Sequence, residues 1–380
     1  HNHVASLIDD NGNSIFKAYS FSNSSNGADS LIDKLKKYST DDIIIGMEAT
    51  GHYWLALYSY LLEKDFNIIV INPIQTDAWR HATDIRKRKT DSSDSVLIAD
   101  FIRFGNFKTS SIADEKYLNL RNMTRFRHSL IEQIGDLKRK IIANLDLVFP
   151  EYSSYFSDIF GQTSKEILLN FNTAEDFKNL KTRDFEKVLR NITLKKSATI
   201  KLNSLKQMSQ SSFGVKFALS SYSIQIKCLI EQIKVIEDQT KLIENEIESI
   251  VKDLNTPIFT IPGIGYVTGA VILAELGDIN KFSSDKKIVA YAGLDATVNQ
   301  SGQSDGQHGH LSKRGSTHLR KALFQAAFVA STNDTIFKDF YDKKRKEGKH
   351  HLVAVNAVAR KMCHVIYAVL KKNEPYVEQK

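Results

Sequence analysis

The segment DDIIIGME, residues 41–48, is a short apolar run that ends in a glutamate. A second apolar run, FNIIVINP at residues 66–73, is stopped by Pro73. Helical patterns lie between and after the two runs. Apolar strands that alternate with helices are typical of a sheet covered on both faces. We therefore predict an α/β domain over residues 1–110.

The start of the chain has the alternating pattern of a β-hairpin. Residues 4–8 and 14–20 are the predicted strands. The segment between them contains Asn11 and Gly12, a pair that supplies the positive φ of a tight turn at little cost. The chain does not begin with methionine, and we interpret its start as a cut end.

Composition and charge narrow the class of protein. The 380 residues are enough for two or three domains with their own cores. A formal net charge of +8 and a pI of about 9.1 favour a polyanionic partner, nucleic acid before membrane. Cys228 and Cys363 are the only cysteines, which excludes a disulfide framework and a cysteine-based zinc site and fits a reducing cytosol. The longest apolar runs, such as residues 266–276, are too short to span a bilayer, and we find no secretory signal.

Residues 111–255 are predicted to be a helical linker that contains a coiled coil. A long helical pattern covers residues 114–150, and small helices with loops are expected over the polar residues 151–220. Beyond them, apolar residues recur at alternating steps of three and four, and we predict self-association through this coiled coil. The alternative is an intramolecular helical hairpin formed with residues 114–150. The repeat is carried by Ile226, Leu229, Ile233, Ile236, Thr240, Ile243, Ile247, Ile250 and Leu254.

Residues 256–380 are predicted to be a second globular unit that is mainly helical. Its first segment, TPIFTIPGIGYVTGAVILAELGD, is similar to a helix–hairpin–helix with Gly263 and Gly265 in the tight turn. Such a turn presents backbone N–H groups to a phosphate, although simple helix packing also explains the two glycines. A loop-rich stretch and two closing helices follow, the last predicted over residues 351–371.

Three carboxylates form a candidate metal site. Asp91 and Asp94 are three residues apart, so on a helix they project from one face. Glu48 ends an apolar strand, and the carboxyl ends of strands are where α/β domains place their sites. Hard oxygen ligands of this kind suit Mg²⁺ or Mn²⁺. The alternative is that Asp91 caps a helix beginning near Ser92 and that Asp94 complements the helix dipole.

The order of these segments resembles a known family. GMEATGHYW, then INP, then KTDSSDSVLIADFI is similar to the DEDD transposases of bacterial insertion sequences, the insertion sequence one-ten family. The resemblance implies an RNase H-like N-terminal domain of the Holliday-junction-resolvase (RuvC-like) type. It also implies that Glu48 is the second acid of a metal-binding tetrad and that Asp91 and Asp94 are the third and fourth. The first acid would lie before His1, in a first strand that is truncated here.

The resemblance extends over nearly the whole chain. LRNMTRFRHSLIEQIGDLKRKIIANLDLVFPE is similar to the family's arginine-bearing linker helix, and IPGIGYVTGAVILAELGDINKF, YAGL and LSKRGSTHLRKALFQAA are similar to its C-terminal transposase domain. By this resemblance Ser301, in NQSGQ, is a nucleophile that forms a phosphoserine link to DNA. Ser304 and Ser312 are close enough to be confused with it. Read from the residues alone, Ser301 and Gly302 form an ordinary turn.

Basic residues and two glycines are the predicted nucleic-acid contacts. The run RKRK precedes Asp91, and a second cluster lies in LSKRGSTHLRK, where no acid occurs between Asp305 and Asp334. Solvated helix faces are the alternative for both. The predicted contacts are Arg86, Lys87, Arg88, Lys89, Arg121, Arg125, Arg127, Gly263, Gly265, Lys313, Arg314, Arg320 and Lys321.

These observations lead to one prediction and two alternatives. The chain is predicted to be a DNA transposase or recombinase of the bacterial cytosol that uses Mg²⁺, or Mn²⁺, and forms a covalent phosphoserine intermediate. The resemblance implies that a structured non-coding guide RNA selects its target and donor DNA, and that it works as a dimer or tetramer. The alternatives are a metal-dependent nuclease or junction resolvase that uses water, with Ser301 structural, and a non-catalytic nucleic-acid-binding remnant.

Overall fold

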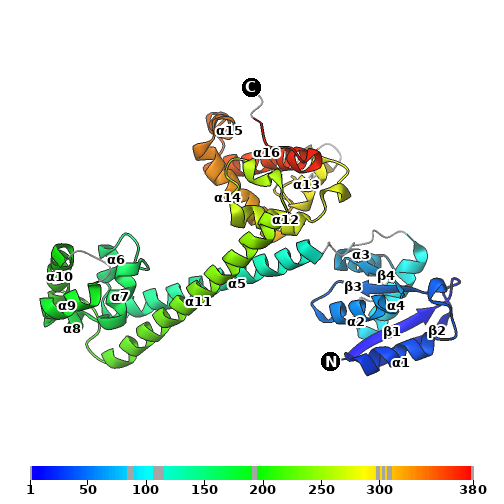
Figure 1. Cartoon of the computed structure of the whole chain (residues 1–380), viewed down its shortest axis with the longest axis horizontal. Helices are drawn as coiled ribbons and strands as arrows, with labels where there is room; N and C mark the ends of the chain where they lie inside the picture. Colours follow the sequence, from blue (N-terminus) through cyan, green and yellow to red (C-terminus); the bar gives the residue numbers. More distant parts are fainter. Residues whose placement is uncertain are drawn as a thin grey trace. The chain divides into compact units, whose positions relative to one another are not determined.

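The computed structural model forms two compact units, residues 1–112 and 113–380 (Figure 1). It describes residues 2–83, 90–105, 115–190, 195–296, 300–301, 304–305 and 310–377, with the backbone alone for residues 195–198, 300, 301, 304, 305 and 335. The N-terminal unit contains, in chain order, β1 (Asn2–Ile8), β2 (Ser14–Ser22), α1 (Ser25–Leu35), the 3-10 helix η1 (Thr40–Asp42), β3 (Ile44–Glu48), α2 (Tyr53–Leu62), β4 (Asn67–Ile71), α3 (Pro73–Thr83) and α4 (Asp91–Phe104).

The four strands of the N-terminal unit form two pairs. The predicted hairpin is confirmed, because β1 and β2 pair antiparallel and Gly12 in their turn has φ of +84°. The two apolar runs form β3 and β4, which pair parallel from Ile44 and Asn67 to Glu48 and Ile71. Within the described residues the pairs are separate two-stranded sheets rather than one continuous sheet. Helices still alternate with β3 and β4, as an α/β pattern requires.

Helix α4 packs on both sheets and is placed against β3 by a glycine. It contacts β1, β2 and β3. A Cβ built on Gly46 of β3 lies 1.8 Å from Ile102 Cδ1 and 3.0 Å from Ile98 Cγ2, so the backbone of β3 approaches the helix closely at this position. On the neighbouring sheet, Ser6 Oγ of β1 lies 2.8 Å from Ser95 Oγ of α4. These contacts fix the second half of α4 against β3 and its first half against β1.

The second unit is almost entirely helical. The first helix of the predicted helix–hairpin–helix is only the short 3-10 helix η2, which begins at Pro257, whereas its second helix is a regular α-helix. The elements are α5 (Glu115–Val148), α6 (Tyr152–Tyr155), α7 (Gln162–Asn170), α8 (Ala174–Lys178), α9 (Thr182–Leu189), α10 (Lys195–Gln210), α11 (Leu219–Asp253), η2 (Pro257–Thr260), α12 (Tyr266–Leu276), η3 (Ile279–Lys281), α13 (Asp285–Tyr291), β5 (Gln300–Ser301), β6 (Ser304–Asp305), α14 (Thr317–Asn333), α15 (Thr335–Lys346) and α16 (His351–Lys372).

Helices α5 and α11 form a long antiparallel hairpin within the chain (Figure 1). Arg127 Nη2 of α5 lies 2.6 Å from Glu244 Oε1 of α11, and Asn144 Nδ2 lies 3.5 Å from Gln225 Oε1 farther along the hairpin. The structure therefore contains the intramolecular alternative, since the apolar repeat of α11 faces α5. Self-association stays a prediction. The buried positions of the repeat are Ile226, Ile233, Thr240 and Ile247.

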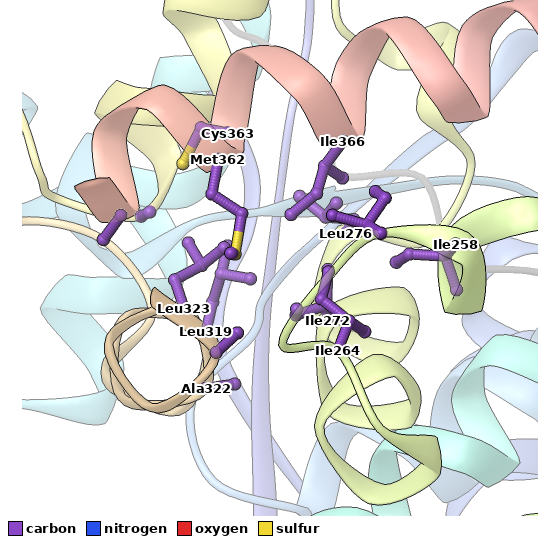
Figure 2. Packing of buried hydrophobic residues seen from close by; sticks show 14 of the residues in the cluster. Ile258, Ile264, Ile272, Leu276, Leu319, Ala322, Leu323, Met362, Cys363 and Ile366 are labelled. Carbon is purple, nitrogen blue, oxygen red and sulfur yellow. The ribbon is translucent and has the colours of Figure 1, made fainter. Parts of the chain in front are cut away.

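The two ends of this hairpin join two separate hydrophobic cores. At one end the small helices α6 to α10 pack on the hairpin around Phe149, Tyr152 and Phe177, which confirms the predicted small helices over residues 151–220. At the other end the hairpin packs against the C-terminal helices, whose core Figure 2 shows. In that core, α12, α14 and α16 meet through residues such as Ile272, Leu323 and Met362.

Helix α16 belongs to this C-terminal core. It is the one helix among the described residues that is long and apolar enough to cross a membrane by length and composition. Its buried face contains Val358, Met362 and Ile366, which pack against the other helices of the core (Figure 2). That packing is what an amphipathic core helix shows.

Candidate active-site residues in the two units

Glu48, the last residue of β3, is held by two threonine hydroxyls. Thr76 Oγ1 of α3 donates to Glu48 Oε2 at 2.7 Å, and Thr50 Oγ1 donates to Glu48 Oε1. Thr76 is only 1% exposed. The parallel pairing of β3 with β4 places Glu48 opposite Ile71, just before the start of α3. The end of one strand and the first turns of the following helix therefore fix this carboxylate.

Asp94 of α4 is paired with a buried arginine of α3. Arg80 Nη2 of α3 lies 3.1 Å from Asp94 Oδ1 of α4, and Arg80 is 7% exposed. Thr76 and Arg80 are four residues apart on α3, so their side chains lie on one face of the helix. One face of α3 therefore binds both Glu48 and Asp94, which come from β3 and α4. The buried Nε of Arg80 has no hydrogen-bond partner within the described part of the chain.

Asp91 is the first residue of α4 and is not its cap. Thr90 Oγ1 accepts a hydrogen bond from the backbone N–H of Ser93 at 3.2 Å, and the N–H of Thr90 donates to Ser93 Oγ at 3.0 Å. This reciprocal capping box satisfies the start of the helix without Asp91, so the alternative in which Asp91 caps the helix is wrong. Asp91 is exposed, and together with Asp94 it lies in the positive first turn of the helix.

The acidic centre, defined as Glu48, Asp91 and Asp94, has the donor chemistry of a divalent metal site. Each ionised carboxylate has about four lone-pair positions, so the contacts with threonine and arginine leave acceptor capacity on Glu48 and Asp94. As the side chains lie, no group of three or more Asp, Glu, His or Cys residues among the described residues is close enough to hold a metal ion. The residues fit Mg²⁺ chemically, with Arg80 balancing the charge of Asp94 in the arrangement seen here. Arg86, Lys87, Arg88 and Lys89 lie outside the described residues.

In the second unit, the predicted nucleophile lies on a short β-hairpin. Strands β5 and β6 pair antiparallel, with Ser301 opposite Ser304. The described residues on either side of this hairpin in the sequence, 291–296 and 310–316, form a stem that we call the serine stem. Ala296 and Leu311 form an isolated bridge in this stem. Ser301 is thus held in backbone pairing with Ser304, and the serine stem lies on both sides of this pair in the sequence.

The serine stem is held mainly by main-chain hydrogen bonds. The N–H of Ser312 donates to the Asp295 carbonyl at 2.8 Å, and the N–H of Lys313 donates to the Gly293 carbonyl at 3.1 Å. The Ser312 hydroxyl also donates to the Asp295 carboxylate, which gives Ser312 a structural role. A Cβ on Gly315 would lie 1.8 Å from the carbonyl oxygen of Tyr291, so only glycine fits there.

A buried glutamate connects this region to the linker helix. Arg125 of α5 binds both carboxylate oxygens of Glu275 at 2.8 and 3.0 Å, and Ser316, the N-cap of α14, donates to Glu275 Oε2 at 2.8 Å. Burial opposes ionisation of Glu275, but the hydrogen bonds from Arg125 and Ser316 and the charges of Arg125 and Arg121 outweigh it and lower its pKa. Arg121 Nε donates to the Ala274 carbonyl at 3.0 Å, which satisfies an open carbonyl in the last turn of α12.

The predicted basic contacts fall into two groups. Arg121, Arg125 and Arg127 all make intramolecular contacts, with the end of α12, Glu275 and Glu244 respectively. Arg320 is half-buried and donates through Nη1 to the Ala292 carbonyl at 3.1 Å. The exposed members beside the serine stem are Lys313, Arg314 and Lys321.

The two glycines of the predicted phosphate-binding turn differ. Gly263 has φ of +83°, and a Cβ there would lie 2.3 Å from the Ala326 carbonyl of α14. Gly265, the N-cap of α12, has open space around its Cα. Helix packing therefore accounts for Gly263, whereas Gly265 remains free of packing constraints. Phosphate binding by this turn stays a prediction.

Sequence reasoning missed the residues that support the candidate sites. Thr76 and Arg80 are among them. They lie four residues apart in the helix that follows an apolar strand, and this spacing could have indicated partners for the two acids Glu48 and Asp94. Glu275 and Ser316 were also missed, because the partner Arg125 is 150 residues away from Glu275 in the sequence.

Two transposase family models match different parts of the chain. A transposase model for the DEDD domain of IS110 elements matches residues 1–150, and a model named transposase IS116/IS110/IS902 family matches residues 255–342. The chain belongs to the IS110 family of transposases.

Curated relatives match the chain over different lengths. An uncharacterized 43.6 kDa protein of insertion element IS110 from Streptomyces coelicolor is 35% identical over 32% of this chain and 30% of its own length. The transposase for insertion sequence element IS1111A from Coxiella burnetii is 32% identical over 31% of this chain and 33% of its own length. The pilin gene-inverting protein of Moraxella bovis is 24% identical over 89% of this chain and 83% of its own length. The similarity to the pilin gene-inverting protein thus includes the linker as well as both ends.

Proposed function

We propose that this protein is a DNA recombinase of an insertion sequence that breaks and rejoins strands through a serine–DNA intermediate. The observation that carries the proposal is the presence of two centres in one chain: two carboxylates, Glu48 and Asp94, bound by one face of α3, and a serine in a short β-hairpin. The family membership of the chain supports DNA as the substrate. The names of the relatives, a transposase and a gene-inverting protein, agree with strand rearrangement rather than simple degradation.

The proposed chemistry divides between the two units. Glu48, Asp91 and Asp94 would hold the divalent ion, Mg²⁺ or Mn²⁺, which supplies charge stabilisation at the transferring phosphoryl group. Ser301 Oγ forms a bond to the phosphorus of a DNA phosphodiester while the bond from phosphorus to one deoxyribose oxygen breaks. The serine proton ends on that leaving oxygen. The phosphoserine link conserves the energy of the phosphodiester, so that a second DNA hydroxyl can reverse the step and rejoin strands.

Arg80 and Thr76 position the acids in this proposal. Arg80 compensates the charge of Asp94 in the arrangement seen here, and a bound cation would supply the same compensation. Thr76 fixes the rotamer of Glu48 through a buried hydrogen bond. Neither residue touches the reacting atoms in this scheme. They determine where the carboxylates point.

The finer parts of the proposal concern partners. A structured non-coding guide RNA would select target and donor DNA. Two or four protomers would bring one chain's acidic centre to another chain's serine. The exposed Lys313, Arg314 and Lys321 beside the serine stem would contact the DNA backbone.

The test uses the full-length protein with its guide RNA, Mg²⁺ and end-labelled donor DNA, and looks for a protein–DNA adduct that survives denaturation. Wild type and Ser304→Ala are expected to form the adduct. Ser301→Ala and Asp91→Ala are expected to lose it. Strand cleavage that persists in Ser301→Ala without any adduct would make the protein a nuclease that uses water and would overturn the proposal.

A further inference from the structure

The loop between α10 and α11 exposes two phenylalanines. Phe213 is 92% exposed and Phe217 is 70% exposed, the two largest values among the exposed phenylalanines of the described residues. They lie four residues apart, with the exposed Lys216 between them. Burying a phenylalanine stabilises a protein by about 1.5–3 kcal/mol, so folding alone gives no reason to place two of them in water. We call residues 212–218 the aromatic loop.

The aromatic loop is fixed to the body of the unit. The N–H of Phe213 donates to Glu151 Oε1 at 2.9 Å, and Ser212 Oγ donates to Glu151 Oε2 at 2.7 Å. The N–H of Val215 donates to the Leu147 carbonyl at 2.8 Å. A Cβ on Gly214 would lie 2.5 Å from the Val148 carbonyl, so the loop backbone lies directly against the end of α5. The two rings are therefore presented by an anchored backbone.

The stretch of sequence that contains the loop carries only positive charges, while Glu151 and Glu175 of neighbouring elements lie against the loop. Residues 188–230 contain seven lysines and arginines and no aspartate or glutamate, whereas the whole chain has 44 acids in 380 residues. Such a stretch attracts a polyanion. It disfavours a second copy of the same face, because a two-fold contact would place like charges against each other. The basic residues are Arg190, Lys195, Lys196, Lys201, Lys206, Lys216 and Lys227.

We propose that the aromatic loop binds single-stranded DNA by stacking unpaired bases on Phe213 and Phe217, with Lys216 contacting the backbone. Aromatic rings that project beside lysine side chains are the usual arrangement for single strands, because every base has a face that can stack. Duplex DNA keeps its bases stacked internally and offers the loop only phosphates. The loop would hold a strand that has been separated from its partner, as strand exchange requires. The choice of DNA rests on the proposed function, but the binding itself needs neither metal nor Ser301.

The experiment measures the fluorescence anisotropy of a labelled oligothymidine of about 20 nucleotides with the full chain, in EDTA so that no cleavage occurs. The variant Phe213→Ala/Phe217→Ala is expected to raise the Kd for the single strand about 10-fold or more and to leave the Kd for a duplex unchanged. Lys216→Ala is expected to reduce the slope of log Kd against log salt by about 0.7. Because both phenylalanines are exposed, the fold and the melting profile are expected to stay intact.

Leu242→Ala is the matched control, since Leu242 is 67% exposed on α11 of the same unit and lies outside the loop. It should leave both Kd values unchanged. Equal loss of single-strand and duplex binding, or no loss, would overturn the proposal. Tighter binding of an RNA oligomer of the same length than of the DNA oligomer would also overturn it. The same holds if the phenylalanine variant loses self-association, or loses binding to anionic vesicles, while its DNA binding is unchanged. If the phenylalanine variant still forms the protein–DNA adduct normally, the proposed function stands even when the proposal for the loop fails.

Discussion

The acidic centre and the serine stem are built in different ways. In the N-terminal unit, side chains from α3 fix the carboxylates: Thr76 binds Glu48 and Arg80 binds Asp94. In the second unit, N–H to carbonyl bonds and Gly315 hold the serine stem, and strand pairing with Ser304 holds the backbone of Ser301. The first arrangement depends on charge and can respond to a cation. The second depends on backbone conformation and should be insensitive to ions.

The largest effect is expected from removing the arginine of the acidic centre. Arg80→Met should destabilise the N-terminal unit by about 2–3 kcal/mol, because it leaves Asp94 with a partly buried and uncompensated charge. The side chain of Asp94 is 23% exposed, which puts the loss at or below the lower end of the range of about 3–5 kcal/mol for breaking a buried pair. Both tryptophans of the chain, Trp54 and Trp79, lie in this unit, so tryptophan fluorescence during urea unfolding reports on it alone.

Two further variants sharpen the Arg80 result. Arg103→Ala breaks the more exposed pair with Asp100 on the same unit and should cost less than about 1 kcal/mol. Adding Asp94→Asn to Arg80→Met should recover part of the lost stability, since the buried charge is then gone. Equal losses for the Arg80 and Arg103 variants would contradict the charge-based account of the acidic centre.

A somewhat smaller effect is expected from the stem glycine. Gly315→Ala should destabilise the second unit by about 1–2 kcal/mol and speed hydrogen exchange at the amides of Lys313 and Ser316, because the added Cβ meets the Tyr291 carbonyl. Gly265→Ala, at a position with open space, should change the free energy of unfolding by no more than about 0.5 kcal/mol. Mass-detected hydrogen exchange distinguishes the two. Unchanged hydrogen exchange in Gly315→Ala would contradict the view that main-chain hydrogen bonds hold the stem.

The secondary structure around both sites could be predicted from local patterns. Asn11-Gly12 predicted the β1–β2 hairpin, and the two apolar runs predicted β3 and β4. The periodicity of α11 predicted its apolar face but not its partner, because a heptad repeat is satisfied equally by α5 of the same chain or by a second chain. The structure of this single chain places that face against α5.

The residues that support the sites could not be found in the same way. Thr76, Arg80 and Glu275 act through tertiary contacts, and no spacing rule connects Arg125 with a glutamate 150 residues away. The sequence predicted Arg125 as a nucleic-acid contact because an arginine on a helix looks the same whether its partner is a phosphate or a carboxylate. The role of Ser301 came from resemblance, that of the three acids from spacing and resemblance together, and all stay predictions.

The next variant tests the negative charge of Glu275, which links the start of α14 to the linker helix α5. Glu275→Gln should cost about 1 kcal/mol at pH 7, a value reduced because Arg125 is about half exposed. The pKa of Glu275 is lowered in the folded protein, so its contribution is present above its ordinary value of 4.5 and is lost as the pH falls through the folded pKa. The urea midpoints of wild type and Glu275→Gln, followed by circular dichroism, should therefore differ at pH 7. This difference should shrink as the pH falls below about 5. A difference that is independent of pH would contradict the assignment.

The smallest effect on stability, near zero, is expected from the exposed cations beside the stem. Lys313→Ala/Arg314→Ala should weaken duplex DNA binding by a similar factor for all sequences and reduce the slope of log affinity against log salt by about 2. Arg127→Ala, which breaks the internal pair with Glu244, should leave that slope unchanged. Salt-dependent filter binding checks both. A reduced slope in Arg127→Ala would show that Arg127 contacts phosphate, in contradiction to this prediction.

The most direct test of the account is to locate the phosphoserine by mass spectrometry. The protein–DNA adduct would be trapped with Mg²⁺ and guide RNA, digested with nuclease and trypsin, and the nucleotide-bearing peptide fragmented. Ser301, Ser304 and Ser312 all lie between Lys287 and Lys313, so a single tryptic peptide distinguishes them. The account predicts the nucleotide on Ser301. A nucleotide on Ser304 or Ser312, or DNA cleavage with no modified serine, would contradict it.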